Sequence, residues 1–74
     1  SERASWVIQM LTKEHLDSLE QFFQHNNFAQ INEMKSIATH LNITDCYVRT
    51  WFRYRLFKET AIRLRRRYLP FVAA

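Results

Sequence analysis

Glycine is absent from this sequence, and proline and cysteine each occur once, at Pro70 and Cys46. The lack of glycine excludes phosphate-cradling glycine loops, dinucleotide-binding fingerprints and tight type I′ hairpins. A single cysteine excludes an internal disulfide framework and metal sites built from several thiolates. No apolar run approaches the roughly 18 residues that a membrane-spanning helix needs, and no signal-peptide pattern opens the chain. We therefore expect a soluble segment that does not cross a membrane.

The composition is that of a small folded domain. Apolar residues make up 47% of the 74 residues and charged residues 24%, which is typical of a single globular domain with one hydrophobic core. Because the only proline lies close to the end, everything before it is free to be helical. The sequence predicts an all-α fold.

Positive charge is concentrated in the last third of the chain. Up to residue 48 there are six acidic and three basic residues, whereas from Arg49 onward there are eight basic residues and only one acidic residue, Glu59. Such asymmetry is typical of proteins that bind a polyanion, an acidic partner protein or an anionic membrane surface.

Apolar spacing predicts two short helices in the first half. Thr12 is a favourable N-cap, and the spacing after it predicts a helix from about Lys13 to Gln24. We expect Asn26-Asn27 to end this helix, because asparagine tolerates the left-handed conformation. A second apolar stripe predicts a helix over residues 31 to 41.

A third, longer helix follows a short turn at Asn42-Ile43. Thr44 is its expected cap, and nothing interrupts it before Pro70. At roughly 1.5 Å per residue it would span about 36 Å, so its second half is expected to project from the body. A turn this short between two amphipathic helices favours a helix-turn-helix arrangement.

The segment Val48–Arg55, with the sequence VRTWFRYR, resembles the third helix of the homeodomain family, whose signature is Val/Ile-x-x-Trp-Phe-x-Asn-Arg. The match extends backward without gaps and covers about residues 4 to 63. The resemblance implies a three-helix homeodomain-like bundle with a helix-turn-helix and an extended third helix. We expect an N-terminal arm over 1–9, the bundle over 10–63 and a basic helical extension and tail over 64–74. The core that the resemblance implies comprises Leu19, Phe23, Leu41, Val48, Trp51 and Phe52.

Arg55 is expected to be structural. On a helical wheel it shares one arc with Val48, Trp51 and Phe52, so it needs an anion close by. In the resemblance, Glu20 stands where a carboxylate of the first family helix pairs with this arginine. We therefore expect a structural ion pair between Glu20 and Arg55.

The resemblance also implies DNA binding, with departures at several positions. Family members place the third helix in the major groove and a basic arm in the minor groove, and a near-invariant asparagine bonds adenine. That asparagine is Tyr54 here, whose single hydroxyl cannot present a paired donor and acceptor. Three family residues that hold the DNA backbone are replaced by Phe28, Met34 and Leu56. Trp6-Val7-Ile8 replaces arm arginines, and an apolar arm is expected to pack on a core or a partner.

The leading hypothesis is a divergent homeodomain that regulates transcription in the nucleus and binds double-stranded DNA with weakened sequence specificity. The arginine cluster 63–67 also fits a nuclear-import signal by composition. The candidate DNA-binding residues are Arg49, Thr50, Arg53, Tyr54, Phe57, Lys58, Arg63, Arg65, Arg66 and Arg67.

A competing hypothesis is a protein-interaction module. An apolar heptad stripe on the side of the third helix away from the core is typical of a surface that pairs with another helix. Because the flanks are cationic, a homodimeric zipper is disfavoured and an acidic partner helix is favoured. Alternatively, the helix frays after about residue 60 and the later members of the stripe are chance. The candidate interaction residues are Tyr54, Phe57, Ala61, Leu64 and Tyr68.

Two further possibilities carry less support in the sequence. Leu69–Val72 is apolar and would suit a juxtamembrane segment of a larger protein. No enzyme is expected: the histidines lack metal-ligand spacing, no serine is accompanied by an arranged histidine and aspartate, and so small a domain offers no deep catalytic cleft. We expect neither a metal nor a cofactor.

Overall fold

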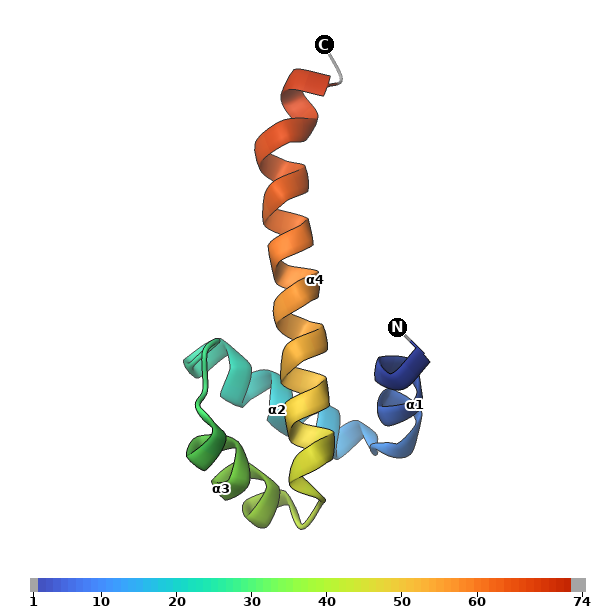
Figure 1. Ribbon diagram of the computed structural model, residues 1–74, viewed down its shortest axis with the longest axis vertical. Helices are drawn as coiled ribbons and strands as arrows, with labels where there is room; N and C mark the ends of the chain where they lie inside the picture. The colour runs from blue at the N-terminus through green and yellow to red at the C-terminus, as the bar shows by residue number, and fades with distance from the viewer. Residues whose placement is uncertain (1, 73–74) are drawn as a thin grey trace.

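The computed structural model describes the backbone of residues 2–72 and the side chains of residues 6–67. Its helices are α1 (Glu2–Met10), α2 (Lys13–His25), α3 (Ile31–Leu41) and α4 (Asp45–Val72). In Figure 1, α4 stands upright and crosses α2, with α3 on one side of its lower half and α1 on the other. The described part contains no strand. The all-α prediction is confirmed, and α1 is a helix in addition to the three expected.

The start of α2 is fixed by a reciprocal cap. The hydroxyl of Thr12 accepts a hydrogen bond from the backbone N–H of His15 at 3.1 Å, and Nδ1 of His15 accepts one from the backbone N–H of Thr12 at 3.4 Å. Two otherwise unpaired donors of the first turn are thereby satisfied. The prediction of Thr12 as the cap is confirmed.

The expectation of a left-handed residue at Asn26-Asn27 is wrong. Asn26 is extended (φ −152°), and its side chain makes the turn instead. Oδ1 accepts a hydrogen bond from the N–H of Phe28 at 3.1 Å, and Nδ2 donates to Oε2 of Glu33 at 2.8 Å. Among the described residues the left-handed conformation is confined to Asn42 (φ 57°), which ends α3.

The core lies where α4 crosses α2 and α3. Phe23 makes edge-to-face contacts with Trp51 and Phe52, with ring centroids 6.0 and 5.9 Å apart. Each of these side chains is buried, and burying one fully contributes about 1.5–3 kcal/mol. Leu41 is only partly buried at the margin. The buried core residues are Val7, Leu11, Leu19, Phe23, Ala29, Ile37, Ala38, Val48, Trp51 and Phe52.

Helix α1 occupies the segment predicted as an arm and packs on α4. Val7 is only 2% exposed, and Leu11, just after α1, is also buried. The ring of Trp6 meets the ring of Tyr47 edge to face, with centroids 5.8 Å apart. The apolar segment thus packs on the core of its own domain. The finer division at residues 9 and 63 stays a prediction.

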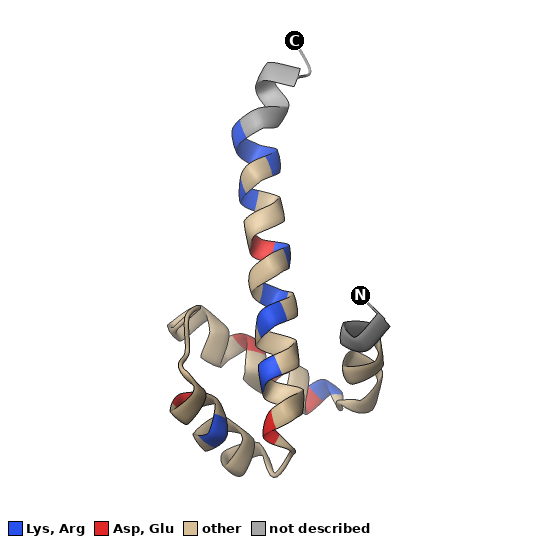
Figure 2. Cartoon of the chain, viewed as in Figure 1, with Lys and Arg blue, Asp and Glu red and all other residues tan. Residues whose placement is uncertain are grey.

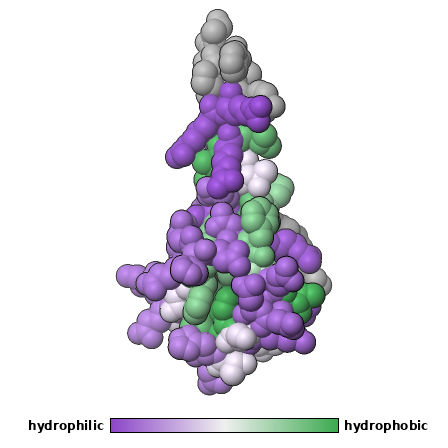
Figure 3. All heavy atoms as spheres, turned by 90° about the vertical axis from the view of Figure 1, so that its left-hand side faces the viewer, coloured by the Kyte–Doolittle hydropathy of each residue, from purple (hydrophilic) through white to green (hydrophobic). Residues whose placement is uncertain are grey.

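The second half of α4 extends past the other helices. The molecule measures 48 × 24 × 19 Å, and Figure 1 shows the upper part of α4 standing alone. Basic residues follow one another along this part in Figure 2. In Figure 3 hydrophilic side chains with apolar ones between them cover this part, and apolar residues also show on the body below. The prediction that Pro70 ends the helix is wrong: α4 continues to Val72, because the fixed φ of proline, about −65°, is itself compatible with a helix.

Candidate nucleic-acid interface

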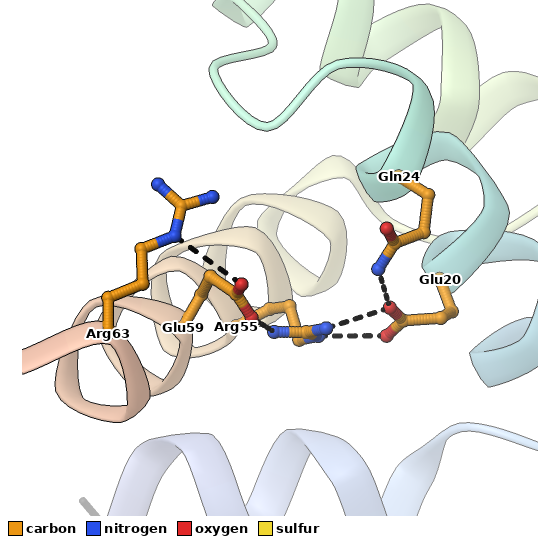
Figure 4. Close-up of polar contacts among 5 residues, drawn as sticks. All are labelled: Glu20, Gln24, Arg55, Glu59 and Arg63. Carbon is orange, nitrogen blue, oxygen red and sulfur yellow. Dashed lines mark hydrogen bonds and ion pairs between the residues drawn. The ribbon is translucent and has the colours of Figure 1, made fainter. Parts of the chain in front are cut away.

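Arg55 is held against the body by two carboxylates. Its Nε and Nη2 donate to Oε1 and Oε2 of Glu20 at 2.9 and 3.0 Å, and its Nη1 donates to Oε2 of Glu59 at 3.0 Å (Figure 4). The guanidinium also lies 4.5 Å from the ring centroid of Phe23. Only 18% of its side chain is exposed. Arg55 therefore braces α4 against α2 and is not presented to a ligand.

The same contacts shift the titration of the three groups. Hydrogen bonding to Arg55 lowers the pKa of Glu20 despite partial burial, and Gln24 adds a hydrogen bond of 2.7 Å. Hydrogen bonding to Arg55 likewise lowers the pKa of Glu59. The hydrogen bond to Glu20 raises the pKa of Arg55 further above its already high value. All three groups are charged at neutral pH, and each stabilises the charge of its neighbour.

The side of α4 away from the core carries a mixed cationic and apolar surface. We call it the outward face and define it as Thr50, Arg53, Phe57, Ala61 and Leu64. Phe57 is 75% exposed, Leu64 is 49% exposed and Thr50 is half-buried. Arg53 is exposed and makes no ion pair with any described side chain. The face is thus available to a ligand from outside the domain.

Tyr54 and Lys58 lie at the edge of this face, beside α1 and α2. Tyr54 is half-buried, and both residues line a shallow hollow of about 340 Å³ together with Ile8 and Leu16. Helix α1 therefore stands next to the position that carries the base-reading asparagine in the resemblance. Arg53 and Phe57 lie on the more exposed side of α4.

The remaining candidate residues are exposed cations along α4. Arg49 lies 3.8 Å from Asp45, and Arg63 lies 3.5 Å from the second oxygen of Glu59. Arg65, Arg66 and Arg67 are exposed on the projecting part. Several guanidinium groups along this one helix are therefore available to bind the phosphate oxygens of a polyanion. The side chain of Tyr68, the last member of the predicted stripe, lies outside the described residues.

A sequence profile of the Homeodomain family matches residues 9–60, which span α2, α3 and the part of α4 that carries the core and Thr50, Arg53 and Phe57 of the outward face. The chain belongs to the homeodomain family. It is 38% identical over 47 residues to homeobox protein Mix.1 of Xenopus laevis and 32% identical over 56 residues to homeobox protein B-H1 of Drosophila ananassae. These matches cover 64% and 72% of this chain but only 12% and 9% of the two relatives. No solved structure matches.

Membership confirms the family inferred from Val48–Arg55, a family whose members are in general DNA-binding transcription regulators. No helix in the described part of the chain has the length and hydropathy to span a membrane. Within that part, no group of three or more histidine, cysteine and acidic side chains is arranged to hold a metal.

Three features of this homeodomain were not predicted from the sequence. The helix α1 had a signal in the four-residue spacing of Val7 and Leu11, which places both on one helical face. The second carboxylate at Arg55 could have been found from the four-residue spacing of Arg55, Glu59 and Arg63. For the apolar groove between α3 and α4 the sequence contained only a partial signal, because the residues that line it come from separate segments.

Proposed function

We propose that this homeodomain binds double-stranded DNA in the nucleus through the outward face and the cations that flank it, with weakened discrimination between bases. The observation that carries the proposal is the exposure of Arg53 on the outward face of α4, where it makes no ion pair with a described side chain. An arginine in the major groove can donate two hydrogen bonds to guanine. Arg49, Lys58 and the arginines of the projecting part supply phosphate contacts around it.

Weakened discrimination is supported by what surrounds Arg53. Tyr54 is half-buried at the edge beside α1, and its side chain lacks the paired donor and acceptor that reads adenine. Phe57 offers bases only an apolar contact, which suits a thymine methyl group. The segment that would enter the minor groove in the resemblance is instead a helix with Val7 buried. Phosphate contacts then supply a larger share of the affinity than base contacts do.

A salt titration tests the proposal. Binding of a fluorescent duplex of random sequence is measured by anisotropy between about 50 and 200 mM salt, where log K falls by about 0.9 per phosphate contact for each decade of salt. Lys58→Gln is expected to reduce the slope by about one contact. Lys13→Gln on α2 is the matched control and should leave the slope unchanged. A flat slope, or no binding at the lowest salt, contradicts the proposal.

A second experiment tests the weakened discrimination. The base preferences of Tyr54→Asn and Tyr54→Ala are compared by selecting bound DNA from a pool of duplexes of randomised sequence. Since a bidentate contact to a base contributes about 1–3 kcal/mol of discrimination, the asparagine variant is expected to select adenine at one position and the alanine variant is not. If neither variant selects, α4 does not enter the groove as proposed.

A second candidate function is protein interaction through the outward face. It is supported by the exposure of Phe57 (75%) and Leu64 (49%) on one side of α4, since an exposed apolar stripe on a helix is typical of a helix-binding surface. The cations beside the stripe favour an acidic partner helix over a second copy of this chain. Sedimentation with Phe57→Asp and Leu64→Asp distinguishes the two functions: loss of protein association with DNA binding retained supports the second.

A further inference from the structure

An open apolar groove lies on the other flank of α4, between this helix, α3 and the loop before α3. It has a volume of about 380 Å³. Two of its side chains are strongly exposed, Phe28 at 72% and Ile31 at 58%, while Phe52 forms its buried floor. Figure 3 faces this side and shows apolar spheres on the body, framed by hydrophilic ones. The residues that line the groove are Asn27, Phe28, Ala29, Ile31, Met34, Arg49, Phe52, Arg53 and Leu56.

The apolar residues of the groove stand where polar contacts to a DNA backbone are expected from the resemblance. Phe28 has no hydroxyl, and Met34 and Leu56 carry no charge. Phosphates placed over these three side chains would lose water without gaining hydrogen bonds. A ligand with apolar side chains would instead bury Phe28 and Ile31, which the domain itself leaves exposed. The lining of the groove therefore favours protein over DNA.

The rim of the groove gives the charge of such a ligand. Arg49 and Arg53 stand along its α4 side; Arg53 has no described ion pair, and Arg49 has only a loose contact of 3.8 Å with Asp45. At the other end, Ile31 begins α3, and the side chain of Gln30 makes no capping hydrogen bond there. The first turn of α3 already holds an acidic residue, Glu33, so it is the α4 side, with Arg49 and Arg53, that favours negative groups. A ligand with an apolar stripe and acidic residues beside it matches this pattern.

We propose that the groove docks an amphipathic segment of a partner protein, whose apolar side chains pack on Phe28, Ile31, Met34 and Leu56 and whose acidic side chains pair with Arg49 and Arg53. The site meets the outward face only at Arg53, whereas Phe57 and Leu64 lie outside it. It shares Arg49 and Arg53 with the proposed DNA contacts. Docking of such a segment is therefore expected to weaken DNA binding, because its carboxylates and the DNA phosphates compete for the same guanidinium groups.

The test uses three synthetic helical peptides and the isotope-labelled domain. The first peptide has one stripe of leucine and tryptophan flanked by glutamates, the second replaces each glutamate by lysine, and the third scrambles the stripe. Backbone amide shifts are followed during titration. We expect the first peptide to shift the amides of residues 27–34 and 52–56, and the other two to bind at least about tenfold more weakly.

Variants locate the site. Phe28→Ser and Ile31→Ser should each weaken binding of the first peptide by about tenfold. Since both side chains are exposed, neither change should unfold the domain, and the melting curve of each variant verifies this. Met10→Ser, at an exposed apolar position of α1 outside both surfaces, is the matched control and should leave peptide binding unchanged.

Three results overturn the proposal. The first is equal binding of the glutamate and lysine peptides, the second is amide shifts confined to the outward face, and the third is the absence of binding at millimolar peptide. A duplex DNA that shifts the groove amides, together with loss of DNA affinity in Ile31→Ser, would assign the groove to DNA instead. The salt titration with Lys58→Gln measures DNA binding separately, so failure of the groove proposal leaves the proposed function standing.

Discussion

Both halves of α4 are helical, but the side chains around them differ. In the inner half, Val48, Trp51 and Phe52 are buried against the other helices and Arg55 is tied to Glu20. In the outer half, Leu64 and the arginines from Arg65 onward are exposed on a projecting rod (Figure 1). The inner half is therefore held by packing, whereas the outer half depends on its own helix propensity.

The largest effect that this comparison predicts is from truncating an inner aromatic. Phe52→Ala is expected to cost about 3–5 kcal/mol, which is comparable with the total stability of so small a domain, about 4–11 kcal/mol. Phe57→Ala, on the exposed side of the same helix, should change stability by less than about 0.5 kcal/mol. Urea unfolding followed by circular dichroism measures both. Similar losses for the two variants would remove the distinction between the two sides.

The next effect tests whether α1 belongs to the inner structure. Val7→Ala removes two buried carbon groups from α1, each worth about 0.8 kcal/mol plus a cavity cost, so we expect a loss of about 2 kcal/mol. Gln9→Ala, at an exposed position of the same helix, should be neutral. The measurement is the unfolding free energy together with hydrogen exchange of the α1 amides. Unchanged stability in Val7→Ala would mean that α1 packs only loosely.

A smaller effect is expected at the ion pair, with a definite pH dependence. Glu20→Gln should cost about 1–2 kcal/mol at neutral pH, since a charge-assisted pair is lost at a partly exposed site. Because the pKa of Glu20 is lowered in the folded state from 4.5, its contribution is present above that value and disappears as the pH falls through the lower, folded pKa. The difference between wild type and variant should therefore shrink below about pH 4.5. A difference that stays constant with pH contradicts this account of the pair.

The smallest effect comes from one substitution made in each half. Thr50→Gly in the inner half should lower the unfolding free energy by roughly 0.5–1 kcal/mol, because the helix must form for the domain to fold. Thr60→Gly in the outer half should lower the helical signal while leaving the unfolding midpoint unchanged. Equal shifts of the midpoint would show that the whole of α4 unfolds as one unit.

Much of the fold could be predicted because it depends on local signals. Thr12 caps a helix by its own side chain, and the spacing of Val48, Trp51 and Phe52 marks a buried stripe. The prediction of a left-handed residue at Asn26-Asn27 was wrong because the side chain of Asn26 makes the turn, and that side chain also bonds Glu33, seven residues away. Such pairings are not visible in a local pattern.

The candidate site was predictable only as a list of residues. The sequence placed Arg53, Tyr54 and Phe57 on one side of the third helix. It did not indicate that α1 would stand beside Tyr54, because helical periodicity gives the face of a residue and not what packs against it. The groove was missed for a similar reason: Phe28, Ile31 and Leu56 come from a loop and two helices and meet only in the folded chain.

The central claim is that the inner half of α4 builds the fold and leaves Arg53 and its neighbours to bind DNA. Its most direct test is the titration of the isotope-labelled domain with a short duplex, read as amide shifts along the chain. The account predicts shifts at Thr50, Arg53, Phe57 and Lys58 and along the arginines beyond them, with α3 unaffected. Shifts centred on α3 or α1, with the outward face of α4 unchanged, would contradict it.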